Sequence, residues 1–161
     1  MNTSAKIMCL CACLSVSLSA NAQKKSDVEE IKAVILRETK AFFEIDQKTW
    51  ANSWVHEPYA FWSFADTTDV NSFSGWEQIE SGFAEYFRTS KPSTAKIERE
   101  WLGLDIKIFG NGAYVRFNQH VLDNTNRPAQ AEVRVLEKVK GEWKIVCVSV
   151  IALEKDNQPR R

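Results

Sequence analysis

The sequence predicts an α+β domain in which helices come first and a run of strands follows. Apolar residues recur at helical spacing over about residues 28–45 and again over about residues 76–87. From residue 97 onward the segments instead have the length and β-branched composition of strands, with short turn sequences between them. Helices segregated from a run of strands are typical of domains in which the helices cover one face of a mostly antiparallel sheet.

Three helices are expected, and the first should begin at Ser26, because Ser26 and Glu29 have the spacing of a capping box. It should end near Ile45. Its apolar stripe indicates the face that packs on the sheet, and only Glu38 interrupts it. The stripe consists of Val28, Ile31, Ile35, Phe42 and Ile45.

A second, short helix should be capped by Asp46 and carry Trp50 and Trp54. Pro58 should stop it, because the residue before a proline is biased out of the helical conformation. The third helix is expected over Gly75–Arg88, with apolar positions at Trp76, Ile79, Phe83, Tyr86 and Phe87.

Strands account for the rest of the predicted domain. The aromatic run Tyr59–Phe64 has strand length, and Asp66–Asp69 is typical of a turn. The last strand is apolar at both parities from Ile145 on, which indicates either a central strand or an outer face that meets a partner. A four-strand antiparallel meander is expected over Ile97–Phe109, Ala113–Leu122, Ala129–Val139 and Trp143–Leu153.

The first 22 residues have the pattern of a signal peptide. They hold one basic residue (Lys6), no acid, an apolar run and the small-x-small site Ala20-Asn21-Ala22. Cleavage there would leave 139 residues (161 − 22) starting at Gln23. We therefore expect an exported protein, with the bacterial periplasm as its location. A lipoprotein anchored at Cys13 is the alternative, although the apolar run before Cys13 is short.

The mature chain is expected to form one domain over residues 23–153, followed by a disordered polar tail over residues 154–161. It would carry 20 basic residues (21 minus Lys6) against 21 acidic ones, a net charge of −1, which lacks the basic signature of nucleic-acid binding. No second apolar run approaches the roughly 18 residues of a membrane span. Cys147 is the one cysteine left, so an intrachain disulfide is excluded.

Three sequence blocks resemble a known superfamily. They lie at residues 113–123 (A-Y-V-R-F-N-Q-H-V-L-D), 132–135 (E-V-R-V) and 141–146 (G-E-W-K-I-V). Their order and spacing are similar to those of the nuclear transport factor 2-like superfamily, which includes the SnoaL-like domains. The similarity is strongest to the association, or hub, domain of calcium/calmodulin-dependent protein kinase II. Weaker similarity runs through the first predicted helix and Gly75–Pro92.

The resemblance implies a cone-shaped α+β fold with about three N-terminal helices packed on a curved sheet, and a pocket between helices and sheet. In the hub domain arginines on neighbouring strands line that pocket and can hold small carboxylates. Two of these positions match Arg116 and Arg134, and Glu132 matches a nearby acid. The third arginine falls on Val150, and a helix histidine falls near Ile79.

Strand alternation gives an independent reason to group polar residues. It places Tyr114, Arg116, Asn118 and His120 on one face of their strand. In the obvious register Glu132 and Arg134 would share that face, and paired arginines suit the recognition of carboxylates. The alternative is that this polar face is a solvated surface, because the opposite face carries Val115, Phe117, Val121, Val133 and Val135.

Aromatic and titratable residues complete the candidate site. The segments that would wall a pocket contribute Trp54, Tyr59, Trp62 and Trp76, which could equally be core residues. Candidates for acid–base chemistry are His56, His120 and Glu132. No His, Cys, Asp or Glu cluster has metal-ligand spacing, and the chain has no glycine-rich phosphate loop, so we expect neither a metal nor a cofactor.

Three functions remain open from the sequence. The leading hypothesis is an exported domain that binds a small anionic molecule, such as a carboxylate, through Arg116 and Arg134. The second is a SnoaL-like enzyme of the isomerase, cyclase or dehydratase type that uses a pocket histidine or glutamate as acid or base. The third is a pure homo-oligomerisation module, which predicts a filled core without a cavity. We also expect a homodimer formed through the sheet face away from the helices.

Overall fold

The computed structural model describes residues 26–101, 105–122 and 129–152. The predicted signal peptide (1–22) and tail (154–161) therefore lie outside the described residues. The chain divides into two compact units, Met1–Ala33 and Val34–Arg161. In the first unit the described residues, 26–33, are helical. Among all described residues, no helix is both long and apolar enough to cross a membrane.

The start of the first helix differs from the prediction. Ser26 is itself helical, and its hydroxyl donates to Glu30 Oε1 (2.8 Å) rather than capping the backbone, so the capping box predicted with Glu29 is wrong. In the second unit the helix continues over residues 34–43. It ends where Ile45 adopts a left-handed conformation (φ 62°) and the Asp46 N–H donates to Ala41 O.

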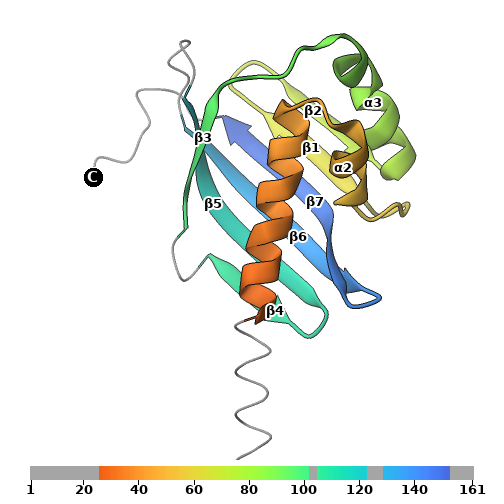
Figure 1. Ribbon diagram of the computed structural model, residues 1–161, viewed down its shortest axis with the longest axis vertical. Helices are drawn as coiled ribbons and strands as arrows, with labels where there is room; N and C mark the ends of the chain where they lie inside the picture. The colour runs from red at the N-terminus through yellow and green to blue at the C-terminus, as the bar shows by residue number, and fades with distance from the viewer. Residues whose placement is uncertain (1–25, 102–104, 123–128, 153–161) are drawn as a thin grey trace, which may run out of the picture. The chain divides into compact units, whose positions relative to one another are not determined.

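Two further helices belong to the second unit: α2 (Gln47–Asn52) and α3 (Trp76–Thr89). The predicted cap of α2 is confirmed, because the Asp46 side chain accepts from the Thr49 N–H at 3.0 Å. However, α2 ends well before Pro58, and Trp54 lies outside it, in an isolated β-bridge with Ile145. Figure 1 shows residues 34–43, α2 and α3 on one side of the sheet.

The sheet is a curved, open, mixed sheet of seven strands in the order β2-β1-β7-β6-β5-β3, with β4 also paired to β5. Among the strand pairs of the described residues, β1 and β7 alone are parallel. The predicted central position of the last strand is confirmed, because β7 lies between β1 and β6. The strands are β1 (Phe61–Ala65), β2 (Val70–Ser74), β3 (Lys96–Glu100), β4 (Ile106–Phe109), β5 (Gly112–Leu122), β6 (Gln130–Val139) and β7 (Glu142–Ala152).

Two strand predictions need correction. The single strand expected over Ile97–Phe109 is two strands, β3 and β4, which pair with different ends of β5. The buried Asp105 lies between them, and its backbone carbonyl accepts from the Arg116 N–H at 2.8 Å. The strand β2 was not expected, because its residues are mostly exposed and lack an apolar pattern.

An irregularity in β7 explains why this strand is apolar at both parities. Val135 pairs with Cys147 while Leu136 pairs with Ile145, so Val146 is an extra residue that forms a β-bulge. Alternation therefore changes phase at Val146. Buried apolar residues lie on the helix-covered face both before the bulge (Trp143, Ile145) and after it (Val148, Val150). We call this helix-covered face the inner face and the opposite one the outer face.

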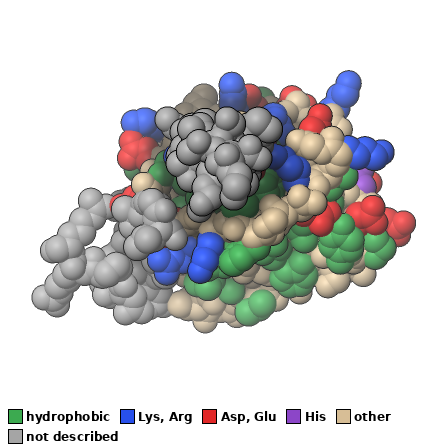
Figure 2. Space-filling model, turned by 90° about the horizontal axis from the view of Figure 1, so that it is seen from below, with side chains coloured by type: hydrophobic (Ala, Val, Ile, Leu, Met, Phe, Trp, Pro, Cys, Tyr) green, Lys and Arg blue, Asp and Glu red, His purple; other side chains and the backbone are tan. Residues whose placement is uncertain are grey.

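Apolar side chains are nevertheless present on the outer face. Cross-strand pairing aligns Tyr114, Val135, Cys147 and Phe61 in one row across β5, β6, β7 and β1. Tyr114 is 40% exposed, and the other three are half-buried. Figure 2 shows hydrophobic side chains side by side on the surface of the molecule seen from below.

The β1–β2 hairpin packs closely on α3. The Phe73 ring lies so near Gly82 that a Cβ on residue 82 would be 2.4 Å from Phe73 Cζ. The same ring stacks on Trp62, with 5.4 Å between centroids, and contacts Phe83 edge-on. Gly82 thus allows the hairpin to approach the helix and holds Trp62 and Phe83 next to each other.

Candidate functional site

The second unit contains a cavity of about 610 Å³ between its helices and the inner face of the sheet. Its lining comes from residues 34–43, α2, α3 and the segment after α3 on one side, and from β1, β5, β6 and β7 on the other. The polar lining residues are Glu38, Thr39, Ser90, Lys91, Ser93, Gln119, Gln130, Glu132 and Arg134.

Most of the cavity wall is aromatic. Phe42 stacks on Tyr86, with 4.4 Å between ring centroids, and meets Phe83 edge-on at 5.4 Å. The Tyr86 hydroxyl donates to the Phe42 carbonyl at 3.1 Å, and burial raises the pKa of this phenol. The remaining aromatic lining residues are Phe43, Trp50, Trp62 and Phe64. These packed rings hold one another in place and leave an apolar space beside them.

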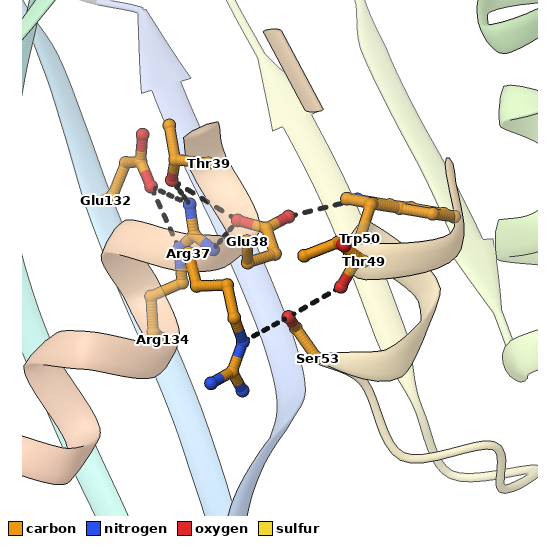
Figure 3. A network of polar contacts seen from close by, with 8 residues as sticks. All are labelled: Arg37, Glu38, Thr39, Thr49, Trp50, Ser53, Glu132 and Arg134. Atoms are coloured by element: carbon orange, nitrogen blue, oxygen red, sulfur yellow. Dashed lines mark hydrogen bonds and ion pairs between the residues drawn. The ribbon is translucent and has the colours of Figure 1, made fainter. Parts of the chain in front are cut away.

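A buried ion network forms the polar side of the cavity (Figure 3). Arg134 donates from Nη1 to Glu38 Oε2 at 2.7 Å, and from Nε and Nη2 to Glu132 Oε2 at 3.0 and 2.8 Å. Its Nη2 also lies 3.4 Å from Thr39 Oγ1. The second oxygen of Glu38 accepts from Trp50 Nε1 at 3.1 Å. The network thus joins the helical residues 34–43, α2 and β6.

All three ionised side chains of this network are removed from solvent. The side chains of Arg134, Glu38 and Glu132 are only 4%, 7% and 1% exposed. Burial alone would lower the pKa of Arg134, but the charges of Glu38 and Glu132 outweigh it and raise that pKa above its ordinary value. Arg134 therefore stays charged, which makes the network a permanent charged wall of the cavity.

Glu38 was not among the site residues predicted from the sequence. In the sequence it only interrupts an apolar stripe, whereas the structure places it at the centre of the network. A carboxylate on the core face of a helix is costly unless it is paired, so its position in the stripe was the available signal. The sequence did not reveal which residue pairs with it.

The predicted grouping of Arg116 with Arg134 is wrong. Val115, not Arg116, pairs with Arg134, while Arg116 pairs with Val133. Residues directly opposite each other share a face, so Arg134 lies on the inner face and Arg116 on the outer one. The physical reason is that Val115 and its apolar neighbours on β5 fill the core, and this fixes the register.

The other polar candidates on β5 follow Arg116 to the outer face. The Arg116 guanidinium is 65% exposed and lies 3.4 Å from Asp105 Oδ1. Asn118 donates to Glu100 at 3.3 Å, and His120 Nε2 lies 3.7 Å from the same carboxylate. With Tyr114, these residues form the solvated polar face that was the alternative expectation, whereas Glu132 and Arg134 line the cavity.

Neither histidine lies in the cavity lining. His56 is exposed, stacks on Trp76 with 4.2 Å between ring centroids, and places Nε2 3.0 Å from the Ala51 carbonyl. His120 is on the outer face. Of the three acid–base candidates, only Glu132 is next to the cavity. The described residues also contain no group of three or more His, Cys, Asp or Glu placed to hold a metal.

The four aromatic candidates separate in the same way. Trp62 lines the cavity, whereas Trp54 and Trp76 are buried in the core, at 3% and 8% exposure, away from it. Tyr59 is 55% exposed. Its hydroxyl donates to Glu137 at 2.5 Å, and this hydrogen bond raises the pKa of Tyr59 to about 12.

Comparison with solved structures decides the fold. An NTF2-like protein with a cystatin-like fold from Novosphingobium aromaticivorans matches at a TM-score of 0.65 with 16% identity, over 87% of this chain and 90% of that chain. The chain has the nuclear transport factor 2-like, cystatin-like fold. No protein-family model matches the sequence, and no curated protein matches it.

Two other neighbours show the range of proteins with the nuclear transport factor 2-like fold. One is assigned as a calcium/calmodulin-dependent protein kinase type II association domain from Thiobacillus denitrificans, at a TM-score of 0.62 and 11% identity over 76% of this chain and 94% of that chain. The other, from Streptomyces avermitilis, is assigned as a dehydratase from the NTF2-like family. It matches at a TM-score of 0.61 with 15% identity, over 81% of this chain and 99% of that chain. The predicted resemblance is thus confirmed for the fold.

Replacing Arg134 by methionine should destabilise the protein strongly. It would leave two buried carboxylates without a counter-charge, and breaking a buried ion pair costs about 3–5 kcal/mol. Denaturant unfolding at pH 7 measures the effect. The matched control is Arg37→Met on the same helix as Glu38. Arg37 is exposed and donates one hydrogen bond, from Nε to Ser53 Oγ at 3.4 Å, so this variant should be destabilised far less than the Arg134 variant. A wild-type-like midpoint for the Arg134 variant would contradict the role given to the network.

Proposed function

We propose that this protein is an exported small-molecule-binding domain whose cavity takes a ligand with an apolar body and an anionic end. The observation that carries the proposal is the cavity itself, which combines aromatic walls with a buried charged side. Concave, mostly apolar sites with a few convergent polar groups are typical of small-molecule binding. A volume of about 610 Å³ suits a molecule the size of an aromatic acid.

The charges around the cavity support an anionic ligand. Arg134 balances one of the two carboxylates, Glu38 and Glu132. Lys91 is the second cation of the lining, so the charged lining residues balance. Arg99, which is not a lining residue, interacts with Arg134, Glu132 and Glu38 and adds one positive charge beyond this balance. This extra charge, not the pair Arg116 and Arg134, supports an anionic ligand.

The other two functions have less support. A filled core, expected for a pure oligomerisation module, does not agree with the cavity. Acid–base catalysis would have to use Glu132, because both histidines lie elsewhere. Arg134 holds Oε2 of that carboxylate with two hydrogen bonds, at 3.0 and 2.8 Å, so this oxygen is already occupied within the network.

We also propose a homodimer formed through the outer face. The row Tyr114, Val135, Cys147 and Phe61 gives this face a continuous apolar strip across four strands. Apolar strips of this kind are favourable when a second copy covers them. Because the bulge at Val146 places Val148 and Val150 on the inner face, the apolar area is smaller than the sequence suggested.

Ligand binding can be tested by filling the cavity from one strand. Val150→Phe would project a ring into the cavity, whereas Ile151→Phe places the same ring on the outer face at the adjacent residue. Saturation-transfer NMR with benzoate, phenylacetate and indole-3-acetate should detect binding to wild type and to Ile151→Phe. The Val150 variant should bind at least about tenfold more weakly, which corresponds to 1.4 kcal/mol. Equal binding by the two variants, or none by wild type, would refute the proposal.

The dimer can be tested by light scattering on the chain from Gln23 onward at micromolar concentration. Wild type should give twice the mass of one chain. Val135→Lys should give the mass of a single chain, because it places a charge in the middle of the apolar strip. The control is Val70→Lys on the edge strand β2, where the side chain is already exposed. A single-chain mass for wild type at all concentrations would exclude the dimer.

Export can be tested by expressing the full chain in a Gram-negative bacterium and measuring the intact mass of the protein released by osmotic shock. Cleavage after Ala22 predicts the mass of a chain that starts at Gln23. Uncleaved protein in the cytoplasmic fraction would contradict export. A mass increased by lipid on a chain starting at Cys13 would favour the lipoprotein alternative instead.

A further inference from the structure

The described lining of the cavity contains two cations, Arg134 and Lys91, and they differ in what they can offer a ligand. Arg134 uses Nε, Nη1 and Nη2 in hydrogen bonds to the protein itself. A ligand anion would have to compete for it with two buried carboxylates, Glu38 and Glu132. Lys91 makes no hydrogen bond or ion pair within the described part of the chain. It is therefore the lining cation that can meet an anion without breaking an existing contact.

Lys91 also marks the opening of the cavity. Among the described lining residues, Lys91 and Ser93 are exposed to solvent, and the others are half-buried or buried. The ion network shown in Figure 3 lies at the other extreme, because the side chains of Arg134, Glu38 and Glu132 are at most 7% exposed. The cavity thus has a solvated mouth beside Lys91 and a charged wall that is closed to water.

The rim that carries Lys91 is held in place before any ligand binds. In Figure 1 the segment that follows α3 leads from this helix to β3. The Ser93 N–H donates to the Phe43 carbonyl at 2.8 Å, which joins this segment to the end of the helix over residues 34–43. Lys91 precedes Pro92, and a residue before a proline favours an extended backbone. The mouth therefore needs little reordering when it receives a charged group.

These charges determine the direction in which an anionic ligand can enter. An anion pressed against the deep wall would lose its water and meet two carboxylates whose counter-charge is already hydrogen-bonded. An anion at the mouth keeps part of its hydration and has Lys91 beside it. An apolar group has the opposite preference, because the rings of Phe42, Trp62 and Phe83 form the interior wall. The favourable orientation has the apolar end inside and the charge outside.

We propose that the cavity takes amphiphilic anions that enter with the apolar end first and leave the anionic head at the mouth, next to Lys91. This inference rests on the proposed function and specifies its ligand class. Lysine is a compact charge without the paired donors of arginine, so the head can be a carboxylate, a sulfonate or a phosphate. Because the head lies in solvent, it can also be larger than the cavity would hold. The class is therefore aryl-alkanoic acids and their conjugates.

The experiment compares three probes by NMR titration of the chain from Gln23 onward at pH 7: 4-phenylbutanoate, the uncharged 4-phenylbutanamide, and N-(4-phenylbutanoyl)taurine. Wild type should bind the acid about two- to fivefold more tightly than the amide, since an ion pair at an exposed lysine contributes only modestly. The taurine conjugate should bind within about threefold of the acid, because its longer head still ends in solvent beside the lysine.

Variants of Lys91 test the assignment, and they should fold like wild type because this side chain is exposed. Lys91→Met should remove the preference for the acid and leave the amide affinity unchanged, whereas Lys91→Arg should keep the preference. Lys91→Glu should reverse it, so that 4-phenylbutylammonium binds more tightly than the acid. The matched control is Lys48→Met, which removes the same charge from an exposed position of α2 outside the lining and should leave every affinity unchanged.

The outcomes separate this inference from the proposed function. If Lys91→Met retains the preference for the acid, or if wild type does not bind the taurine conjugate, the head does not lie at the mouth and the inference is wrong, while the proposed function stands. If wild type binds acid and amide equally, the inference fails together with the anionic part of that function. If wild type binds none of the probes, both fail completely.

Discussion

The fold and the cavity depend on one buried interaction, the guanidinium of Arg134 held between Glu38 and Glu132. Three ionised groups in a protein interior are tolerated only when each has its hydrogen bonds, so these side chains constrain their surroundings tightly. Glu38 must face β6, which fixes the rotation of the helix over residues 34–43, and Trp50 must meet the second Glu38 oxygen, which places α2. The same bonds keep this side of the cavity polar.

Much of the architecture could be predicted from the sequence because local signals were strong. Asp46 has the sequence position of an N-cap, and its side chain does cap α2. The helical pattern predicted after Gly75 closely matches α3. The failures have local causes too. β3 ends at Glu100 and β4 begins at Ile106, although the sequence has strand character throughout this segment. β2 has no apolar pattern because both of its faces are largely exposed. Nothing in the composition of β2 distinguishes it from a loop.

The candidate site could be predicted only in part, because it depends on cross-strand register. From the sequence, Arg134 was grouped with Arg116, and it stayed open whether that polar face lines a pocket or meets solvent. A shift of one residue in register changes which residues share a face. The structure places Arg134 with Val115 on the inner face instead, because Val115 and Phe117 fill the core. Glu132, Arg134 and Trp62 then remain in the cavity, while Glu38, Lys91 and Gln119 are added. These three share no sequence motif, and only folding brings them near one another.

The bulge at Val146 has a consequence for how the site can change over evolutionary time. Before this residue β7 supplies core side chains in one phase, and after it Val148 and Val150 face the cavity in the other. Deleting Val146 would leave Ile145 and Cys147 in ordinary alternation, so Val148 and Val150 would still face the cavity and the strand pairs beyond this point would be kept. A single codon can therefore be lost or gained here without a change in the cavity wall, so the length of β7 can vary at this position while the binding specificity is kept.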